Sequence, residues 1–239
     1  MEKLNTILLA GGKGARLASV VSDRPKPMVD IAGKPFLEWV LTYFRRHGVT
    51  RFTVSLGHMA DVAERYFAAR LADGLTVQTV VEPSPLGTGG GFLFAVSQST
   101  PAEQYILSNG DSLLLADLAP ALELLERENV DGVILGRAME DASRYGSMVF
   151  DKTGRLTSFS EKKAGTGVIN GGVYLFNRRV LESLPQTVPM SMERDGIPEL
   201  LAQGVRLYVS VSNAPFIDIG LPETYYQAKD FVKKYLQEA

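Results

Sequence analysis

The chain of 239 residues is 45% hydrophobic and 22% charged, so it carries enough apolar material to bury the core of one large α/β domain. Its formal net charge of −2 and the lack of any apolar run of about 18 residues make nucleic acid and membranes poor partners, and we expect a cytoplasmic protein. The sequence has no cysteine and two histidines that stand apart from acidic clusters, which excludes thiol chemistry and argues against a zinc site or a histidine-based triad.

The first predicted element is a short buried strand over residues 4–9, which runs into the segment "AGGKGARL". A near-continuous apolar run that ends at glycine is typical of a parallel strand covered on both faces. The glycines at 11, 12 and 14 let backbone N–H groups surround a phosphate, and Arg16 adds a planar guanidinium that can grip phosphate oxygens. The alternative is a tight strand exit, because the dinucleotide-binding and P-loop patterns are both absent.

A lysine between two prolines follows in the segment Arg24-Pro25-Lys26-Pro27-Met28. The prolines predict an extended backbone, which would carry the Lys26 ammonium group on a stiff support. Such scaffolding favours a functional lysine near the glycine segment.

Helices and strands then alternate. Pro35 opens a predicted helix that Gly48 ends, residues 52–56 alternate as a strand, the apolar stripe from Val62 to Leu71 indicates a second helix, and residues 76–81 form a third strand. This order implies right-handed crossovers and a parallel, Rossmann-like sheet whose ligands bind at the carboxyl ends of the strands.

The third strand ends at Glu82, and the next nine residues, "PSPLGTGGG", include six helix-breaking prolines and glycines. This composition predicts an irregular loop as far as Gly91 and a helix from Phe92, with glycines that let the backbone approach a flat ligand. A carboxylate at Glu82 can accept hydrogen bonds from the two adjacent donors on a guanine edge. A solvated loop glutamate is the alternative.

A fourth strand over residues 105–107 leads into Asn109-Gly110-Asp111. A carboxylate at the end of a central strand, beside a phosphate loop, suits Mg²⁺, which prefers hard oxygen ligands shared with substrate phosphates. A simple turn is the alternative interpretation of these three residues.

Hairpins and a final helix characterise the rest of the chain. Strands over 147–150 and 156–160 flank the turn at 151–154 and predict antiparallel strands over the site. Ser191 is expected to cap an irregular helix, residues 207–211 to form a strand, and Pro222 to begin the last helix, which packs on the domain or mediates dimerisation.

Taken in order, these motifs resemble the signature of the sugar-1-phosphate nucleotidyltransferases. The resemblance covers nearly the whole chain through the segments "LLAGGKGARL", "KPM", "EPSPLGTGGG", "SNGDS", "FSEKK", "INGGVYLF" and "FIDIGLPE". Ala15 stands where the family usually has a hydroxyl residue, and Phe216 stands where many members have tryptophan.

The resemblance implies an α/β fold with a Rossmann-like, mostly parallel mixed sheet flanked by helices and an antiparallel sugar-binding lid, as in GT-A-like nucleotidyltransferases. We expect one domain over residues 1–239, with a nucleotide-binding core at 1–140 and a sugar-binding part with the C-terminal helix at 141–239. The implied reaction transfers a nucleotidyl group from an NTP, with GTP as the best candidate, to a sugar 1-phosphate and releases pyrophosphate.

The resemblance also implies roles for individual residues. Arg16 and Lys26 would be catalytic, and Asp111 and Asp218 would bind Mg²⁺. The residues expected to bind the nucleotide are Leu9, Ala10, Gly11, Gly12, Gly14, Glu82, Gly87 and Thr88. Those expected to bind the sugar phosphate are Gly146, Glu161, Lys162, Asn170 and Gly171. The glycines at 171 and 172 would leave room for the sugar ring.

Within the family, the resemblance is greatest to the D-glycero-D-manno-heptose 1-phosphate guanylyltransferases, which prepare GDP-heptose for bacterial surface glycans. Mannose 1-phosphate guanylyltransferases and uridylyltransferases acting on N-acetylmuramate or glucose 1-phosphate are the enzyme alternatives. The non-enzyme alternative is a regulatory paralogue that binds a nucleotide sugar, although such a protein has no need of the complete set Arg16, Lys26, Asp111 and Asp218. A homo-oligomer is possible.

Overall fold

The computed structural model describes residues 2–12, 14, 16–17, 20–21, 23–70, 74–143, 145–161 and 165–237, with only the backbone described at residues 2, 160 and 161. Lys162, the predicted sugar-phosphate ligand, lies outside the described residues, as do Ala15 and Leu71.

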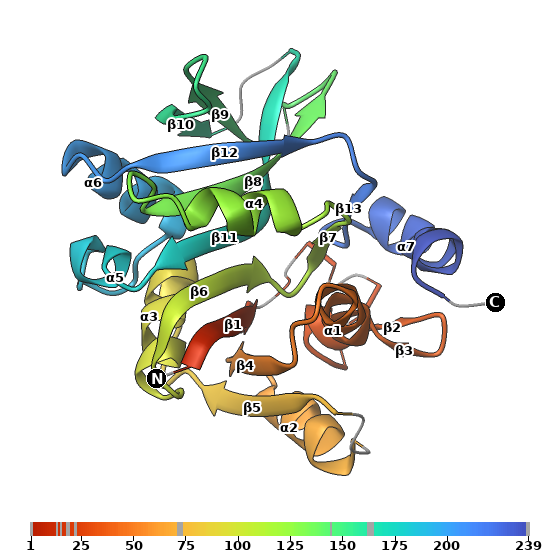
Figure 1. Cartoon of the computed structure of the whole chain (residues 1–239). Helices are drawn as coiled ribbons and strands as arrows, with labels where there is room; N and C mark the ends of the chain where they lie inside the picture. Colours follow the sequence, from red (N-terminus) through yellow and green to blue (C-terminus); the bar gives the residue numbers. More distant parts are fainter. Residues whose placement is uncertain are drawn as a thin grey trace.

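In the described part of the chain, nine strands form one mixed sheet (Figure 1). Its first half is parallel, in the order β6-β1-β4-β5, and confirms the predicted Rossmann-like arrangement. These strands are β1 (Glu2–Ala10), β4 (Arg51–Leu56), β5 (Thr76–Val81) and β6 (Ala102–Asn109). Since they run the same way, their carboxyl ends meet at one edge of the sheet.

The second half of the sheet is largely antiparallel, as the hairpin pattern predicts. Strand β11 pairs with β6, β8 and β9, the hairpin partner β10 extends β9, and β12 lies parallel to β8. The bounds are β8 (Gly132–Met139), β9 (Gly146–Phe150), β10 (Leu156–Glu161), β11 (Gly167–Asn177) and β12 (Leu207–Ser212).

Two short ladders lie outside the main sheet. The first joins β2 (Asp30–Ile31) to β3 (Lys34–Pro35) in the predicted reversal before the first helix. The second joins β7 (Ser112–Leu114) to β13 (Phe216–Asp218) in antiparallel register and connects the middle of the chain to its last quarter.

Apolar clusters cover both faces of the main sheet. One cluster involves α1 (Phe36–Arg46), α2 (Ala60–Ala69), α4 (Ala119–Leu125) and α7 (Pro222–Tyr235). The other involves α3 (Gly87–Ser97), α5 (Val180–Ser183) and α6 (Ile197–Ala202). Burial on two faces accounts for the continuous apolar runs of the central strands.

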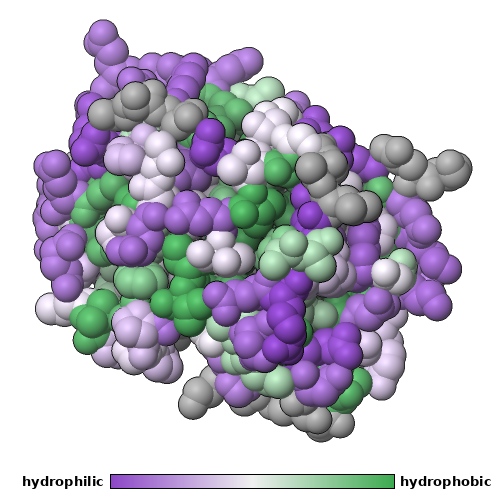
Figure 2. All heavy atoms as spheres, turned by 90° about the horizontal axis from the view of Figure 1, so that it is seen from below, coloured by the Kyte–Doolittle hydropathy of each residue, from purple (hydrophilic) through white to green (hydrophobic). Residues whose placement is uncertain are grey.

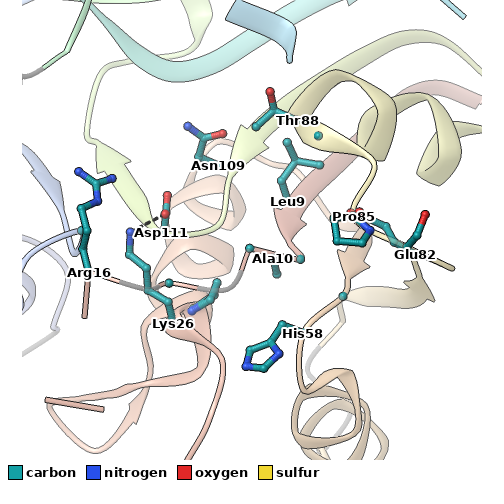
Figure 3. A pocket seen from close by; sticks show the side chains of 18 residues that line it. Leu9, Ala10, Arg16, Lys26, His58, Glu82, Pro85, Thr88, Asn109 and Asp111 are labelled. Carbon is teal, nitrogen blue, oxygen red and sulfur yellow. Dashed lines mark hydrogen bonds and ion pairs between the residues drawn. The ribbon is translucent and has the colours of Figure 1, made fainter. Parts of the chain in front are cut away.

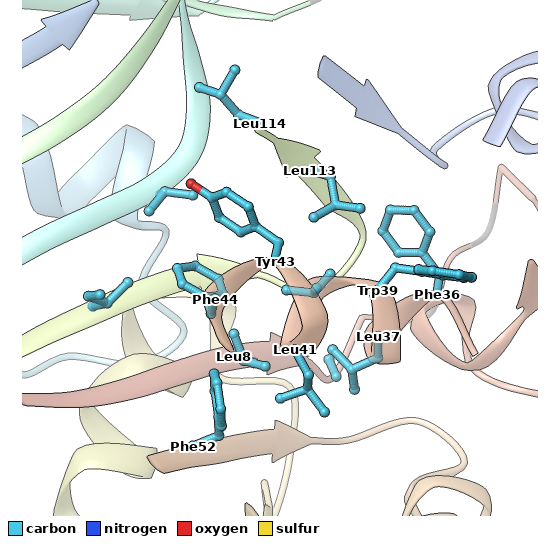
Figure 4. Packing of buried hydrophobic residues seen from close by; sticks show 14 of the residues in the cluster. Leu8, Phe36, Leu37, Trp39, Leu41, Tyr43, Phe44, Phe52, Leu113 and Leu114 are labelled. Carbon is cyan, nitrogen blue, oxygen red and sulfur yellow. The ribbon is translucent and has the colours of Figure 1, made fainter. Parts of the chain in front are cut away.

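Figure 4 shows how the first cluster holds α1 against the sheet, beside Leu8 of β1 and Phe52 of β4. Leu113 and Leu114 of β7 join the same cluster, so the strand that follows Asp111 is anchored in the core. The last helix packs here too, through the buried residues Ala228 and Val232.

At the molecular surface, hydrophilic side chains dominate the face seen in Figure 2 and surround smaller groups of hydrophobic ones. Of the helices in the described ranges, none has the length and apolar character needed to cross a membrane.

Two local predictions are wrong. Lys26 is not in extended backbone. It begins a 3-10 helix over Lys26–Met28, and Pro25, directly before it, keeps the extended conformation. The segment after Glu82 is not irregular as far as Gly91, because α3 already begins at Gly87. Prolines and glycines at the start of a helix are compatible with its first turn, where backbone N–H groups have no intrahelical partner.

The glycines of α3 have a packing role that their composition alone does not reveal. The segment 188–192 lies against the first turn of this helix, and the Met190 carbonyl accepts hydrogen bonds from the N–H groups of Gly89 and Gly90 at 2.9 and 3.1 Å. A Cβ on Gly87 would lie 2.4 Å from the Met190 carbonyl oxygen, and one on Gly89 would lie 2.1 Å from the Met190 Sδ. These glycines therefore make room for protein, and not only for a ligand.

We predict that Gly87→Ala destabilises the fold more than Gly204→Ala does. Both glycines have a φ of +77°, which is unfavourable for alanine, but a Cβ on Gly204 meets no atom within 4 Å. The clash at Met190 should therefore add about 1–3 kcal/mol to the loss of unfolding free energy. Urea denaturation without ligand measures both variants, and equal losses would contradict the packing role of Gly87.

Candidate functional site

A cavity of about 680 Å³ opens where the four parallel strands end (Figure 3). Gly11 and Gly12 follow β1, His58 follows β4, Glu82 follows β5, and Asp111 follows β6. This is the edge at which open parallel sheets bind ligands.

All residues predicted to be catalytic or to bind the nucleotide line this cavity, together with one predicted metal ligand. They are Leu9, Ala10, Gly11, Gly12, Gly14, Arg16, Lys26, Glu82, Gly87, Thr88 and Asp111. Further lining residues not assigned from the sequence are Pro27, Gly57, His58, Ser84, Pro85, Asn109 and Gly220. The turn-forming segments after each strand could have indicated these residues. The sequence does not show that the segments meet at one cavity, because that depends on the order of the strands in the sheet.

One end of the cavity is charged. Figure 3 shows Arg16, Lys26 and Asp111 together on one side, with the Lys26 Nζ 2.6 Å from the Asp111 Oδ2. The Lys26 side chain is 11% exposed and the Asp111 side chain 37% exposed, so this ion pair is only partly screened by water. A Cβ on Gly14, whose φ is +59°, would lie 2.9 Å from the Lys26 Cβ, so the glycine segment packs directly on the lysine stem.

The short ladder between β7 and β13 brings Asp111 and Asp218 together. Asp218 is paired with Ser112, and the Ile219 N–H donates to the Asp111 carbonyl at 3.0 Å. The Asp218 Oδ1 accepts a 2.8 Å hydrogen bond from the Gly220 N–H. A Cβ on Gly220 would lie 2.5 Å from that oxygen and 3.5 Å from the Lys26 Nζ, so the lysine and both carboxylates border one small space.

Tyr145 is a contributor to which the sequence assigned no role. Its hydroxyl donates to the Asp218 Oδ2, and its ring packs edge-on against Phe216 with 5.5 Å between the ring centroids. The only signal for it was its position before Gly146 in the "YG" pair. This contact holds the Asp218 carboxylate in one orientation.

The described residues contain no group of three or more His, Cys, Asp or Glu side chains that could hold a metal ion. Two carboxylates at the charged end still suit a cation that takes its remaining ligands from phosphate and water. A tetrahedral structural metal site would need more protein ligands.

The opposite end of the cavity is formed by Glu82, Pro85 and Thr88 (Figure 3). The Glu82 Oε1 accepts from the Ser55 hydroxyl at 3.0 Å, and its Oε2 accepts from the Leu86 N–H at 3.2 Å. Cβ atoms on Gly11 and Gly91 would lie 2.8 and 2.7 Å from the Glu82 Oε1. Glu82 is thus a held carboxylate with spare lone pairs, in contrast to a freely solvated loop glutamate.

Of the predicted sugar-phosphate residues, the four that the structure describes are not among those that line this cavity. Gly146 pairs with Glu161 across the β9–β10 ladder, whereas Asn170 and Gly171 lie in β11 at a break in its register. A Cβ on Gly171 would lie 2.5 Å from the Leu114 Cδ2, so that glycine makes room for a core side chain. The neighbouring Gly172 approaches Asn109, since a Cβ there would lie 2.8 Å from the Asn109 Nδ2. Strand β11 therefore reaches the cavity through Asn109.

Comparison with known proteins agrees with this geometry. The chain is 35% identical to the D-glycero-alpha-D-manno-heptose 1-phosphate guanylyltransferase of Aneurinibacillus thermoaerophilus, over 98% of this chain and 100% of that protein. It is 33% identical to the mannose-1-phosphate guanylyltransferase of Mycobacterium tuberculosis, over 94% of this chain and 63% of that protein.

A solved structure is similar throughout. HddC from Yersinia pseudotuberculosis, in its crystal structure complexed with GMP-PN, matches with a TM-score of 0.83 and 36% sequence identity, over 95% of this chain and 98% of that one. The family model described as "Nucleotidyl transferase" matches residues 5–235. The cavity at the strand ends is thus found in a chain that belongs to the nucleotidyl transferase family and is an enzyme of that class.

Proposed function

We propose that this enzyme transfers the guanylyl group of GTP to D-glycero-α-D-manno-heptose 1-phosphate and releases pyrophosphate. The observation that carries the proposal is one cavity with Arg16, Lys26 and Asp111 at one end and a held carboxylate, Glu82, at the other. The identity of the sugar is supported by the relative from Aneurinibacillus thermoaerophilus, which is a D-glycero-alpha-D-manno-heptose 1-phosphate guanylyltransferase.

In this proposal the nucleotide spans the cavity. The base lies beside Glu82 and Pro85, the backbone of Leu9 to Gly12 follows the middle, and the phosphates reach Arg16 and Lys26. Gly12 leaves open space, since a Cβ there would meet no atom within 4 Å, and this suits the close approach of a phosphate. The products would supply the synthesis of surface glycans, and a cytoplasmic location fits these substrates.

Asp111 and Asp218 are the residues that would hold Mg²⁺ against the phosphates. When bound, the ion supplies a Lewis acid that neutralises charge on the transferring group. The donor set fits, because both groups are carboxylates held by neighbouring strands, one by Gly220 and Tyr145 and the other beside Lys26.

In this proposal the side chains of the protein position the two substrates and neutralise the charge of the phosphates. Lys26 and Arg16 place positive charge where the transferring phosphate gains negative charge. Lys26 is held by its ion pair with Asp111, so its charge is in place before the substrate binds. The attacking oxygen belongs to a phosphate monoester that is already anionic, so no side chain has to remove a proton. Gly146, Glu161, Lys162 and Asn170 are proposed to orient the sugar phosphate for in-line attack.

The guanine preference is proposed to rest on Glu82. A guanine edge presents two neighbouring donors, and each oxygen of Glu82 keeps a lone pair after its bond to Ser55 or Leu86. A uracil or thymine edge offers one ring N–H between carbonyl acceptors, which a carboxylate matches less well.

Mannose 1-phosphate is the second candidate acceptor, because the relative from Mycobacterium tuberculosis is a mannose-1-phosphate guanylyltransferase at nearly the same identity. The deciding experiment is a panel of the four NTPs against heptose, mannose, glucose and N-acetylmuramate 1-phosphates, with pyrophosphate release as the measurement. Highest kcat/KM for GTP with the heptose 1-phosphate supports the proposal. Highest kcat/KM with another pair corrects the substrate, and binding without turnover favours a regulatory protein.

We predict that Asp111→Asn lowers kcat by about a hundredfold or more while the fold is retained, because the change removes the charge of a proposed metal ligand but keeps its shape. Pyrophosphate release over a Mg²⁺ titration measures the effect. Asp117→Asn is the matched control, because Asp117 is exposed and caps α4 through the Ala119 N–H, a role that asparagine also fills. Near-normal turnover of Asp111→Asn at saturating Mg²⁺ would contradict the metal assignment.

A second prediction concerns the base. In Glu82→Gln, the amide nitrogen has to avoid the Leu86 N–H and therefore turns toward Ser55, so one acceptor is lost. We expect kcat/KM for GTP to fall on the order of ten- to a hundredfold relative to UTP, which corresponds to roughly 1–3 kcal/mol of discrimination. Use of UTP by the same protein is the internal control. An unchanged GTP-to-UTP ratio would remove Glu82 from base selection.

A further inference from the structure

A chain of hydrogen bonds crosses the molecule from the nucleotide cavity to the sugar side, and one carboxylate lies at its centre. Glu193 belongs to a π-helical turn over Met192–Gly196, directly after the segment that packs on α3. Its Oε2 accepts from the Thr88 hydroxyl at 2.9 Å and from the Ser191 hydroxyl at 3.0 Å. Its Oε1 accepts from the Tyr174 hydroxyl at 2.8 Å.

The chain continues on both sides of Glu193. The Thr88 hydroxyl, which lines the nucleotide cavity, also accepts from the Met192 N–H at 2.8 Å. On the other side, the Tyr174 hydroxyl accepts from the Asn170 Nδ2, and the Asn170 Oδ1 accepts from the Gly172 N–H at 3.0 Å. Figure 3 shows Thr88 at the cavity, near Asn109, which Gly172 approaches from β11.

The direction of every hydrogen bond in this chain follows from the carboxylate. A carboxylate can only accept, so the hydroxyls of Thr88, Ser191 and Tyr174 must point their protons at Glu193. Tyr174 then has only lone pairs to offer Asn170, which must present its amide nitrogen to Tyr174 and its oxygen to Gly172. Burial raises the pKa of the fully buried Tyr174 hydroxyl well above its usual value, so this group remains a proton donor.

We propose that Glu193 is a positioning residue that couples the nucleotide half of the site to the sugar half. It fixes the Thr88 hydroxyl on one side and, through Tyr174, the amide orientation of Asn170 on the other. The free proton of the Asn170 amide is thereby aimed as a donor, which selects a sugar hydroxyl that accepts. This inference rests on the proposed function, because it assigns Thr88 to the nucleotide and Asn170 to the sugar phosphate.

The coupling has a consequence that contacts with the substrates alone do not produce. Loss of the Asn170 amide removes the donor to the Tyr174 hydroxyl, which weakens the cooperative hydrogen bond from Tyr174 to Glu193 and hence the hold on Thr88. Asn170→Ala should therefore raise the KM for the nucleotide, although Asn170 does not line the nucleotide cavity. Residues in one hydrogen-bond network commonly show such non-additive effects.

A double-mutant cycle between Thr88→Val and Asn170→Ala tests the proposal. It uses the full-length protein and the best pair from the substrate panel, and it measures kcat and both KM values. We expect the effect of the double variant on kcat/KM to differ from the product of the two single effects by about tenfold, or about 1.4 kcal/mol. In a Glu193→Gln background the deviation should fall below about twofold, because glutamine can donate to one hydroxyl and no longer fixes the direction of the chain.

Glu199→Gln provides the matched control. Glu199 is an exposed glutamate of α6 whose carboxylate accepts from Gln203, so its change to glutamine should leave the Thr88–Asn170 deviation intact. Independent effects of Thr88→Val and Asn170→Ala in the otherwise unchanged protein would overturn the coupling, as would a deviation that persists with Glu193→Gln. A loss of melting temperature without the kinetic deviation would also overturn it and leave Glu193 a structural residue. If the unsubstituted protein turns over no substrate pair, the proposed function fails first.

Discussion

Two carboxylates that lie far apart in the sequence can serve one cation only if a backbone contact brings them together, and the β7–β13 ladder is that contact. It pairs Asp218 with Ser112 and ties the Ile219 N–H to the Asp111 carbonyl. Because Leu113 and Leu114 are buried in the same cluster as α1, the ladder is anchored in the core of the nucleotide half. Lys26, whose ammonium group is paired with Asp111, adds a positive charge beside these two acidic residues.

The same arrangement places the glycine segment directly against the lysine. Gly14 lies against the stem of Lys26, so a side chain there would displace the ammonium group from Asp111. The Gly110 N–H also bonds the Leu9 carbonyl at 2.8 Å, which fixes the end of β6 against the end of β1. The charged end of the cavity is thus assembled from three chain segments that hold one another in place, and its groups need little rearrangement to meet a phosphate.

Apolar runs that end in glycine or acidic residues mark strand ends directly, so the sequence was sufficient to predict the parallel half of the sheet. The family resemblance then indicated the lining residues that were assigned in advance, whereas others, such as Gly57, His58 and Asn109, were missed. The glycines of α3 were interpreted as room for a ligand, since sequence gives no sign that Met190 packs on them. Lys26 was expected in extended backbone from its two flanking prolines, which do not show that a 3-10 helix begins there. Tyr145 and Glu193 could not be given their partners, because both act through residues brought near by long-range strand pairing.

Glycine in this family signature therefore reflects two different demands. The space beside Gly12 is open, as a phosphate cradle requires. The space where Cβ atoms of Gly87 and Gly89 would lie is occupied by the segment that carries Met190. That segment leads directly into Glu193, so the packing that excludes a side chain from α3 also delivers a carboxylate to Thr88. Partly buried polar groups are costly unless they are satisfied, and here the acceptor-only carboxylate meets three hydroxyl donors. Because Glu193 accepts from Thr88 of α3 and from Tyr174 of β11, it provides a polar connection between the two elements that we propose to contact the nucleotide and the sugar phosphate.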